Sequence, residues 1–415
     1  MTHARLQPGQ LRGFWAAWSG WALDGMDSFI YALALAPALT QLLPASGYSG
    51  SPAAVAFAGS MLFALFLVGW GLSFLWGPVA DRIGRTRTLA AAILCYAVFT
   101  GAAAFAHDVW QFAICRLLAG IGIGGEWSLA GTYVAESWPE ERRVRGAGYL
   151  QTGYYVGFFL AAALNYTVGA SYGWRALFLC GALPVLVAIY VLRSVPEPER
   201  WRTPSQGAPL RRILTGPFRR RTLINAGLAT VSIVGLWAGT VYEPTAILQL
   251  AKVAGYSPVA ATRWASIGTG LLSICTVLGC LAVPPLAQRL GRRKAHAVFF
   301  LGMASSISVS FGWAFYQSLP LFIVTLLPLG FFGGNFAMYS LWLPEQYPTS
   351  IRATAFAFVT SFGRFIGAGM NFAIGAAVAA YGSIGIPVAS TALAFLFGVL
   401  LLPAALETRG SRLPD

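Results

Sequence analysis

The sequence predicts an all-α membrane protein with twelve transmembrane helices in two six-helix repeats and with both termini in the cytoplasm. Three observations lead to this fold class: an apolar composition, twelve long apolar stretches, and basic residues that gather in alternate loops. Of the 415 residues, 57% are hydrophobic and only 10% are charged. A soluble domain carries about 25% charged residues, because its surface faces water. The composition therefore argues against a soluble enzyme.

Twelve stretches of the chain are long and apolar enough to span a membrane, which takes about 20 residues. In chain order they cover residues 14–39, 56–80, 88–106, 109–135, 146–168, 172–193, 222–250, 260–288, 295–314, 319–343, 354–379 and 384–406. The five cysteines all lie inside these stretches and show no metal-ligand spacing. They are interpreted as packing residues, and neither a metal nor a cofactor is expected.

Basic residues gather in alternate loops between these stretches. Loops on one side contain 23 of the 28 Lys and Arg residues. The other side holds only Arg175, Lys252 and Arg263. Because cytoplasmic loops carry the excess of Lys and Arg, both termini are predicted to be cytoplasmic. The net charge of +14 is thus explained by membrane orientation, and no nucleic-acid partner is expected.

The two halves of the sequence resemble each other. The paired segments are GPVADRIGRTR (77–87) with PPLAQRLGRRK (284–294), GIGGEW (122–127) with FFGGNF (331–336), and Glu136-x-x-Pro139 with Glu345-x-x-Pro348. The repeat predicts an N-terminal six-helix half (1–193), a cytoplasmic central loop (194–221) and a C-terminal six-helix half (222–415). Such repeats indicate a substrate site between the halves near mid-membrane, with one half rocking against the other.

Two motifs in the first half resemble signatures of the major facilitator superfamily. They are Gly77-x-x-x-Asp81-Arg82-x-Gly84-Arg85 and Arg116-x-x-x-Gly120-x-Gly122-x-Gly124. The stretches LDGMD (23–27) and GGEW followed by YVAE (133–136) are similar to metabolite–proton symporters that import organic acids, such as the lactate/sialate and aromatic-acid groups. Asp27 and Arg116 also occupy the positions where proton-coupled sugar porters keep an acid and an arginine.

Six charged residues fall inside the apolar stretches: Asp24, Asp27, Arg116, Glu126, Glu243 and Arg364. A charge at the centre of a membrane helix costs roughly 2.5–3.5 kcal/mol on insertion scales, so such residues usually face a cavity and work there. At about 1.5 Å per residue, Asp27 and Arg116 both lie about 20 Å from the inner boundary. The two side chains can therefore meet.

Asp27 is the predicted proton-binding carboxylate, because Arg116 would hold it ionised while desolvation would oppose the charge. Asp24, one helical turn away, and Glu126, nearer the cytoplasm, are further proton-coupling candidates. The alternative for Asp27 is a static ion pair that only fixes helix packing. Glu126 could instead act as an inner gate or hold helices together, and Glu243 is expected to be an interface or outer-gate residue.

Arg364 is the predicted anchor for a substrate anion, because a guanidinium can bind a carboxylate through two parallel hydrogen bonds. Arg116 is a second candidate for this contact. The alternative for Arg364 is a structural bond to a carbonyl or to one of the acids. Polar and aromatic side chains near mid-membrane are expected to shape the pocket around the substrate: Tyr31, Gln151, Tyr154, Tyr155, Trp237, Asn335, Tyr339 and Asn371.

Charged residues at the cytoplasmic ends of the stretches are expected to form a gate. The resemblance implies that Asp81 helps to latch the outward-facing state through contacts with arginines, for which Arg82 and Arg85 are the candidates. Glu136 and its repeat counterpart Glu345 complete the predicted gating set. The counterpart of Asp81 is Gln288, so the gate is expected to be lopsided. The alternative is a cluster of charges that only orients the protein.

The predicted function is proton-coupled uptake of a small organic acid by alternating access, with no enzymatic activity. The acid would be a monocarboxylate, a sialate-like acid or an aromatic acid. Alternatives are a proton-driven efflux antiporter for acids or drugs, and a non-transporting membrane sensor with the same fold. Arginine outnumbers lysine 26 to 2, which indicates a GC-rich bacterial genome. The expected location is the bacterial inner membrane, with lipid as the surrounding partner and a monomeric state.

Overall fold

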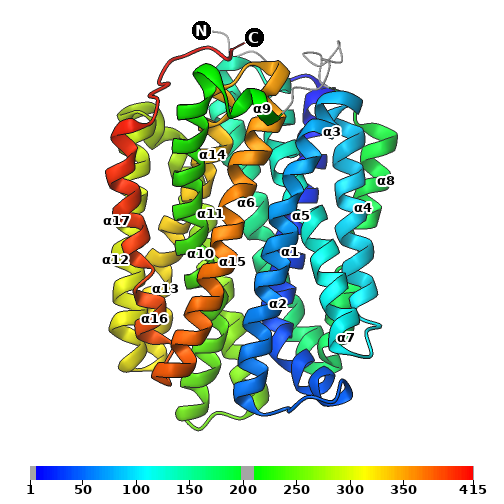
Figure 1. The fold of residues 1–415 in the computed structure, drawn as a ribbon, viewed down its shortest axis with the longest axis vertical. Helices are drawn as coiled ribbons and strands as arrows, with labels where there is room; N and C mark the ends of the chain where they lie inside the picture. Colours follow the sequence, from blue (N-terminus) through cyan, green and yellow to red (C-terminus); the bar gives the residue numbers. More distant parts are fainter. Residues whose placement is uncertain (1–5, 198–209, 415) are drawn as a thin grey trace.

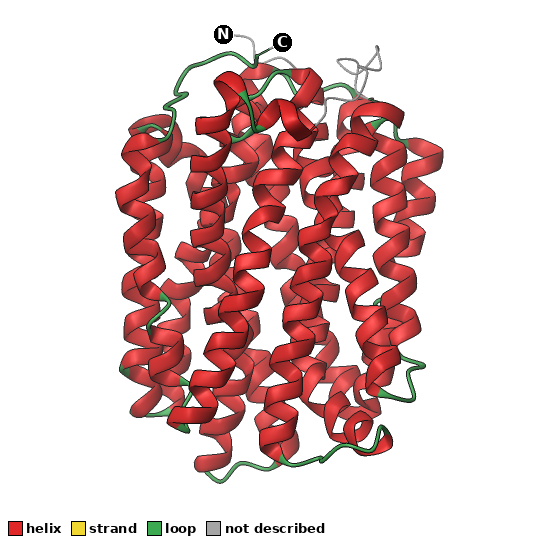
Figure 2. Cartoon of the chain, viewed as in Figure 1, coloured by secondary structure: helices red, strands yellow, loops and turns green. Residues whose placement is uncertain are grey.

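The computed structural model describes residues 6–197 and 210–414. These residues form helices joined by short loops, and no strand occurs among them, as Figure 2 shows. Residues 200 and 202 of the predicted arginine-rich central loop lie outside the described ranges. The prediction of an all-helical bundle is confirmed for the described chain.

In the described chain, eight α-helices lie within residues 6–197 and nine lie within residues 210–414. The N-terminal helices are α1 (Pro8–Ala45), α2 (Pro52–Leu72), α3 (Trp76–Ile83), α4 (Arg85–Ala103), α5 (Val109–Ser137), α6 (Glu140–Leu164), α7 (Ala170–Cys180) and α8 (Pro184–Ser194). The C-terminal helices are α9 (Leu210–Ile213), α10 (Arg219–Val253), α11 (Pro258–Leu290), α12 (Arg292–Gly312), α13 (Leu319–Gly333), α14 (Ala337–Trp342), α15 (Arg352–Tyr381), α16 (Gly385–Ala389) and α17 (Ala392–Leu401).

Ten helical segments of the described chain are long and apolar enough to cross a membrane. One of them, Glu140–Ser194, contains 55 residues. A straight helix of that length would measure about 80 Å, far more than a hydrocarbon core of about 30 Å. Gly173 interrupts the segment with a φ of 81°, a conformation that glycine adopts without steric cost. The chain therefore has about ten to twelve candidate membrane helices.

The helices run along the long axis of the molecule, and both ends of the described chain lie at the same end of the bundle (Figure 1). We call this the terminal end and the opposite one the distal end. The N-terminal helices meet the C-terminal helices mainly through two pairs, α6 with α11 and α2 with α15. Any site between the two groups must therefore lie among α1, α2, α6, α10, α11 and α15 or their neighbours.

Glycine lets α1 and α6 approach closely beside this interface. A Cβ atom on Gly157 of α6 would lie 1.9 Å from the carbonyl oxygen of Ala22 in α1. A Cβ atom on Gly25 of α1 would lie 2.0 Å from the carbonyl oxygen of Tyr154 in α6. Small residues commonly permit such backbone contacts between membrane helices. The position of Tyr154 relative to α1 thus depends on two glycines.

We predict that Gly157→Ala destabilises the protein, because the new methyl group forces α1 and α6 apart. Overpacking of this kind costs typically about 1–3 kcal/mol. The matched control is Gly369→Ala in α15, where the added Cβ atom would meet nothing within 4 Å. Thermal unfolding of the purified protein should show a lower midpoint for Gly157→Ala only. Equal midpoints in both variants would contradict the close contact.

Candidate functional site

A small cavity of about 10 Å³ lies where the N-terminal and C-terminal helices meet. Its lining is Trp21, Trp70, Trp127, Gln151, Tyr154, Tyr155, Leu236, Trp237, Phe336 and Arg364. Seven of these ten side chains are aromatic. The volume is about that needed by a single water molecule, so the aromatic side chains nearly fill the space. We call it the central cavity.

Arg364 supplies the positive charge of the central cavity. Its side chain is 1% exposed, and its Nε and Nη1 atoms have no hydrogen-bond partner among the described residues. The Cζ atom lies 4.0 Å from the ring centroid of Trp70 and 5.8 Å from that of Trp127. A buried guanidinium normally satisfies its N–H groups, because leaving them unpaired is costly. Arg364 thus has two N–H groups beside the central cavity that no described residue satisfies.

Stacked aromatic rings surround Arg364. The ring of Trp21 is parallel to that of Trp127, with 5.8 Å between centroids, and stacks on Tyr154 at 4.4 Å. Trp70 meets Trp237 edge to face at 5.2 Å. Sequence reasoning identified Tyr154 and Trp237 but missed three of these tryptophans. Their signal in the sequence is weak, because a tryptophan in a membrane helix is usually a packing residue.

Asp27 and Arg116 meet inside the N-terminal helices, as their equal depth predicted. Their closest side-chain atoms, Oδ1 and Nη1, are 3.5 Å apart, and both side chains are fully buried. Thr100 of α4 connects the pair: it donates a hydrogen bond of 2.7 Å to Asp27 and accepts one of 2.8 Å from Arg116. Sequence reasoning missed Thr100, which carries no signal of its own within an apolar stretch.

Arg116 and Tyr31 do not line the central cavity. The guanidinium of Arg116 lies over the rings of Phe178 and Tyr31, with centroid distances of 4.9 Å and 5.4 Å. The structure thus places Arg116 beside Asp27, and Arg364 alone among the intramembrane arginines lines the cavity.

Asp24 and Glu126 form a second acidic group close to the cavity. Both side chains are fully buried, and no hydrogen bond of normal geometry reaches their carboxylate oxygens from the described residues. Asp24 lies within electrostatic range of Glu126, Asp27 and Arg364. Glu126 therefore belongs to the same cluster as Asp24, although the sequence suggested that it sits apart, nearer the cytoplasm.

The predicted pocket residues of α6 and those near α14 occupy different places. Gln151, Tyr154 and Tyr155 line the central cavity, and Gln151 accepts a 3.2 Å hydrogen bond from Ser340 of α14. Asn335 and Tyr339 lie outside it, where both hydrogen-bond to Ser232 of α10 at 2.8 Å. These two side chains connect helices of the C-terminal group.

Glu243, for which an interface or outer-gate role is predicted, lies inside the C-terminal group of helices. Its side chain is fully buried and accepts a 2.9 Å hydrogen bond from Thr269 of α11.

A larger cavity of about 410 Å³ opens between the two groups of helices toward the distal end. Residues of α1, α2, α10 and α15 line it, and Asn371 is one of them. Phe63 of this lining lies 5.8 Å, centroid to centroid, from Trp237 of the central cavity. This ring pair stands between the larger cavity and the central one.

Ion pairs close the terminal end of the bundle. Arg85 binds Asp81 at 2.7 Å and Glu136 at 3.3 Å within the N-terminal helices. The same arrangement recurs in the C-terminal group, where Arg292 binds Glu345 at 2.8 Å. Asp81, Arg85 and Glu136 thus share one ion-pair network, and Glu345 belongs to a second one. Arg82 is exposed and has no ion pair within the described ranges, so it is part of neither network.

Two further arginines cross between the groups. Arg352 binds Glu136 at 3.1 Å, and Arg143 lies 3.5 Å from Glu345. Thr354 of α15 adds a hydroxyl hydrogen bond of 2.5 Å to Asp81. Sequence reasoning treated Arg143, Arg292 and Arg352 only as orienting charges. The internal repeat could have identified two of them, because Arg143 and Arg352 are repeat counterparts of each other, just as Glu136 and Glu345 are.

Gln288, the counterpart of Asp81, is exposed and makes no equivalent contact in the described chain. In its place, Thr408 donates a 2.5 Å hydrogen bond to Glu345. The contacts of the two repeats therefore differ at this position, while the gating role remains a prediction.

Comparison with known proteins gives relatives along the whole chain. A probable 4-methylmuconolactone transporter of Cupriavidus pinatubonensis is 30% identical over 97% of this chain and 92% of its own length. The niacin transporter NiaP of Acinetobacter baylyi is 27% identical over 85% of this chain and 84% of its own. The named relatives are transporters, which supports the prediction that the chain is not an enzyme.

A solved structure shares the fold. The proton:xylose symporter XylE from E. coli, bound to 6-bromo-6-deoxy-D-glucose, aligns with a TM-score of 0.79 at 19% identity, covering 97% of each chain. The sequence model of the Major Facilitator Superfamily matches residues 17–370. This match spans most of the chain, and the helical architecture agrees with it: the protein belongs to the Major Facilitator Superfamily.

Proposed function

We propose that the protein imports a small organic acid together with a proton by alternating access. The observation that carries the proposal is the buried guanidinium of Arg364, whose Nε and Nη1 atoms have no hydrogen-bond partner among the described residues, inside an aromatic cavity between the two groups of helices. A cation at this depth is costly unless it serves a ligand or a partner. An anion that enters with a proton moves little net charge through an apolar core.

The preferred substrate is a carboxylic acid with a flat, unsaturated body. Aromatic faces such as those of Trp21 and Trp127 stack favourably on a planar ring, while Arg364 can hold the carboxylate through two hydrogen bonds. Gln151 and the free hydroxyl of Tyr154 could orient further polar groups. Relatives named for 4-methylmuconolactone and niacin support a compact, flat substrate, while a relative named for sialic acid, 31% identical over 48% of this chain, keeps the sialate-like alternative open.

Asp27 is the proposed proton carrier, with Asp24 and Glu126 as relay groups. Protonation of Asp27 would remove its charge from Arg116 and weaken a pair that is already 3.5 Å apart. Asp24 lies within electrostatic range of Asp27, Glu126 and Arg364, so it connects the Asp27–Arg116 pair with the central cavity. One proton shared by neighbouring carboxylates relieves their repulsion. Substrate binding at Arg364 can thereby influence proton binding.

The two six-helix halves, residues 1–193 and 222–415, are proposed to rock about the central cavity, in the manner of repeat-built transporters. The terminal end would be cytoplasmic, because its loops carry most of the basic residues. The ion pairs there would then be an inner gate, closed while the larger cavity opens outward. This arrangement fits a monomer with twelve membrane helices in a bacterial inner membrane.

Transport by proteoliposomes with an imposed inward proton gradient tests the proposal. Benzoate, nicotinate, cis,cis-muconate, lactate and N-acetylneuraminate would be supplied as labelled probes. Accumulation of a flat acid would support proton-coupled import. Depletion from loaded vesicles would instead indicate an efflux antiporter, and absence of transport for every acid would favour a sensor.

We predict that Arg364→Lys weakens substrate affinity, because lysine keeps the charge but cannot form two parallel hydrogen bonds. Loss of one charged hydrogen bond costs about 1.5–3 kcal/mol, or roughly 10- to 100-fold in affinity. Arg263→Lys is the control, since Arg263 is exposed and lies over Tyr166 far from the cavity lining. The concentration for half-maximal uptake is measured. Unchanged affinity in Arg364→Lys would refute the anchor role.

We predict that Asp27→Asn reduces substrate-driven proton uptake to background, because an amide does not take up a proton in this pH range. A pH-sensitive dye inside the vesicles reports the proton movement, and labelled substrate reports exchange. The exposed Glu141 offers a control in Glu141→Gln. Undiminished proton uptake with intact transport would make Asp27 a packing residue, which is the alternative reading of its ion pair.

We predict that Glu136→Gln loosens the terminal end. Its carboxylate is shared by Arg85 and Arg352, and removing one member of a buried ion pair costs about 3–5 kcal/mol. Hydrogen–deuterium exchange should rise at the end of α5 and the start of α15. The control Glu141→Gln should exchange like the parent protein. Equal protection in Glu136→Gln would show that these pairs do not hold the end closed.

A further inference from the structure

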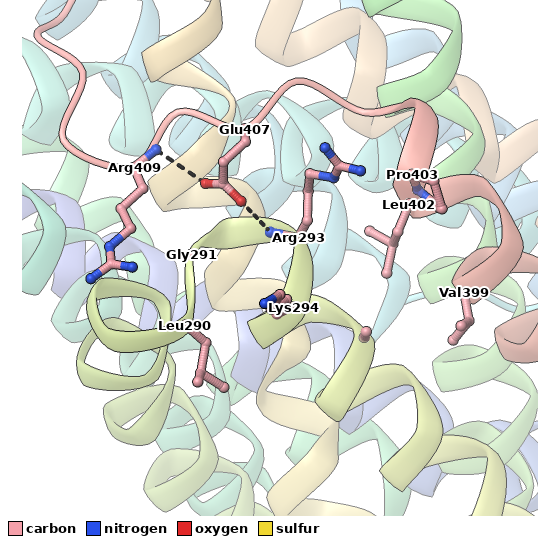
Figure 3. Close-up of a pocket in the computed structure, with 10 residues that line it drawn as sticks. Leu290, Gly291, Arg293, Lys294, Val399, Leu402, Pro403, Glu407 and Arg409 are labelled. Atoms are coloured by element: carbon pink, nitrogen blue, oxygen red, sulfur yellow. Dashed lines mark hydrogen bonds between the residues drawn. The ribbon is translucent and has the colours of Figure 1, made fainter.

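A cavity of about 570 Å³ lies at the terminal end between α12 and α17, away from the central cavity. None of its lining residues belongs to the central cavity or to either ion-pair network described above. Figure 3 shows it between the start of α12, the end of α17 and the segment that follows α17. In Figure 1, α12 and α17 form one outer edge of the bundle. The proposed transport cycle assigns no role to this cavity.

Three basic side chains line the cavity: Arg293, Lys294 and Arg409. Glu407 is the one acid among the lining residues. Its carboxylate accepts backbone hydrogen bonds from Arg292 at 2.9 Å, Arg293 at 3.1 Å and Arg409 at 3.0 Å. The carboxylate of Glu407 is thus occupied by backbone N–H groups, two of them at the start of α12. The three basic side chains form no ion pair among the described residues.

Burial raises the pKa of Glu407, but these backbone donors and the charge of Arg292 outweigh it, so the pKa lies below its usual value. Glu407 is therefore ionised at neutral pH. Even with this acid charged, the cavity keeps an excess of two positive charges, from three basic residues and one acid. Such an excess favours an anion as the occupant.

One wall of the cavity is apolar and continues along the outside of the bundle. Leu290, Val399 and Leu402 contribute to this wall. Beyond it on α17, Leu400 is 78% exposed and Phe397 is 62% exposed. Large apolar side chains exposed side by side on a membrane protein are those that contact acyl chains. The basic side chains of the cavity therefore lie next to an apolar surface that lipid acyl chains can cover.

We propose that this cavity binds the headgroup of an anionic phospholipid whose acyl chains lie along α12 and α17. Arginine and lysine bind the phosphate, and basic pockets between membrane helices suit anionic headgroups. The apolar wall favours a lipid over a free phosphate ion, which would gain nothing from Val399 and Leu402. The excess positive charge of the cavity favours an anionic lipid over a neutral, zwitterionic one. The bound lipid would sit next to Arg292, whose side chain pairs with Glu345.

Native mass spectrometry of the purified full chain tests the proposal. The protein in detergent is titrated with dioleoylphosphatidylglycerol and, separately, with dioleoylphosphatidylcholine. We expect one molecule of phosphatidylglycerol to bind each protein with high affinity. Phosphatidylcholine should bind at least tenfold more weakly. The test variant combines Arg293→Gln, Lys294→Gln and Arg409→Gln. Each cation near an anionic lipid contributes about 1 kcal/mol, or roughly fivefold, so the variant should bind on the order of a hundredfold more weakly.

The matched control combines Arg87→Gln, Arg145→Gln and Arg212→Gln, which removes the same charge from exposed positions at the same end. It should bind phosphatidylglycerol like the parent protein. Equal loss in both variants would overturn the proposal in favour of nonspecific attraction, and no loss in the test variant would overturn it outright. Displacement of the lipid by millimolar glycerol 1-phosphate would show a free-anion site instead. Thermal unfolding of both variants verifies that they fold.

Discussion

Charge buried without water is the physical constraint on which the rest of this structure depends. A membrane core offers no solvent to a guanidinium or a carboxylate, so each one must find a partner or remain costly. Asp27 and Arg116 form an ion pair and both bond to Thr100, although Asp27 Oδ1 and the Nε and Nη1 atoms of Arg116 have no hydrogen-bond partner in the described chain. The Nε and Nη1 atoms of Arg364 have no such partner either, and its guanidinium lies over the rings of Trp70 and Trp127 with no ion pair among the described residues. The two arginines therefore differ in having a carboxylate partner, which Arg116 has and Arg364 lacks in the described chain.

Packing determines where these charges can act. The close contact of α1 with α6 brings Trp21 against Tyr154, and α15 carries Arg364 to the same place through its contact with α2. The aromatic rings leave almost no free volume around the guanidinium. Any molecule larger than water must therefore displace side chains to enter the central cavity. The Phe63–Trp237 contact is the part of this barrier that faces the larger cavity.

The closed terminal end is built twice from the same parts. Arg85 with Glu136 and Arg292 with Glu345 are the two internal pairs, and Arg352 and Arg143 cross between the groups to the same two glutamates. Each glutamate thus joins an internal arginine to one from the opposite group. Ion pairs of this kind hold only while the two groups lie close together, which suits contacts that must form and break. Asp81 and Thr354 add a contact that has no equivalent at Gln288 within residues 6–197 and 210–414.

The sequence by itself determined the helical membrane fold, the repeat and the family, because hydropathy, charge asymmetry and motif spacing are local properties of the chain. It also identified Asp27 with Arg116, since depth along two helices follows from residue counts. Only the tertiary structure decided that Arg364 faces the aromatic cavity while Arg116 does not, and that Asn335 and Tyr339 lie outside the lining. Helix rotation and the pairing of α2 with α15 and α6 with α11 decide which face meets the cavity. Those contacts join residues more than one hundred positions apart, which periodicity within a single helix does not encode.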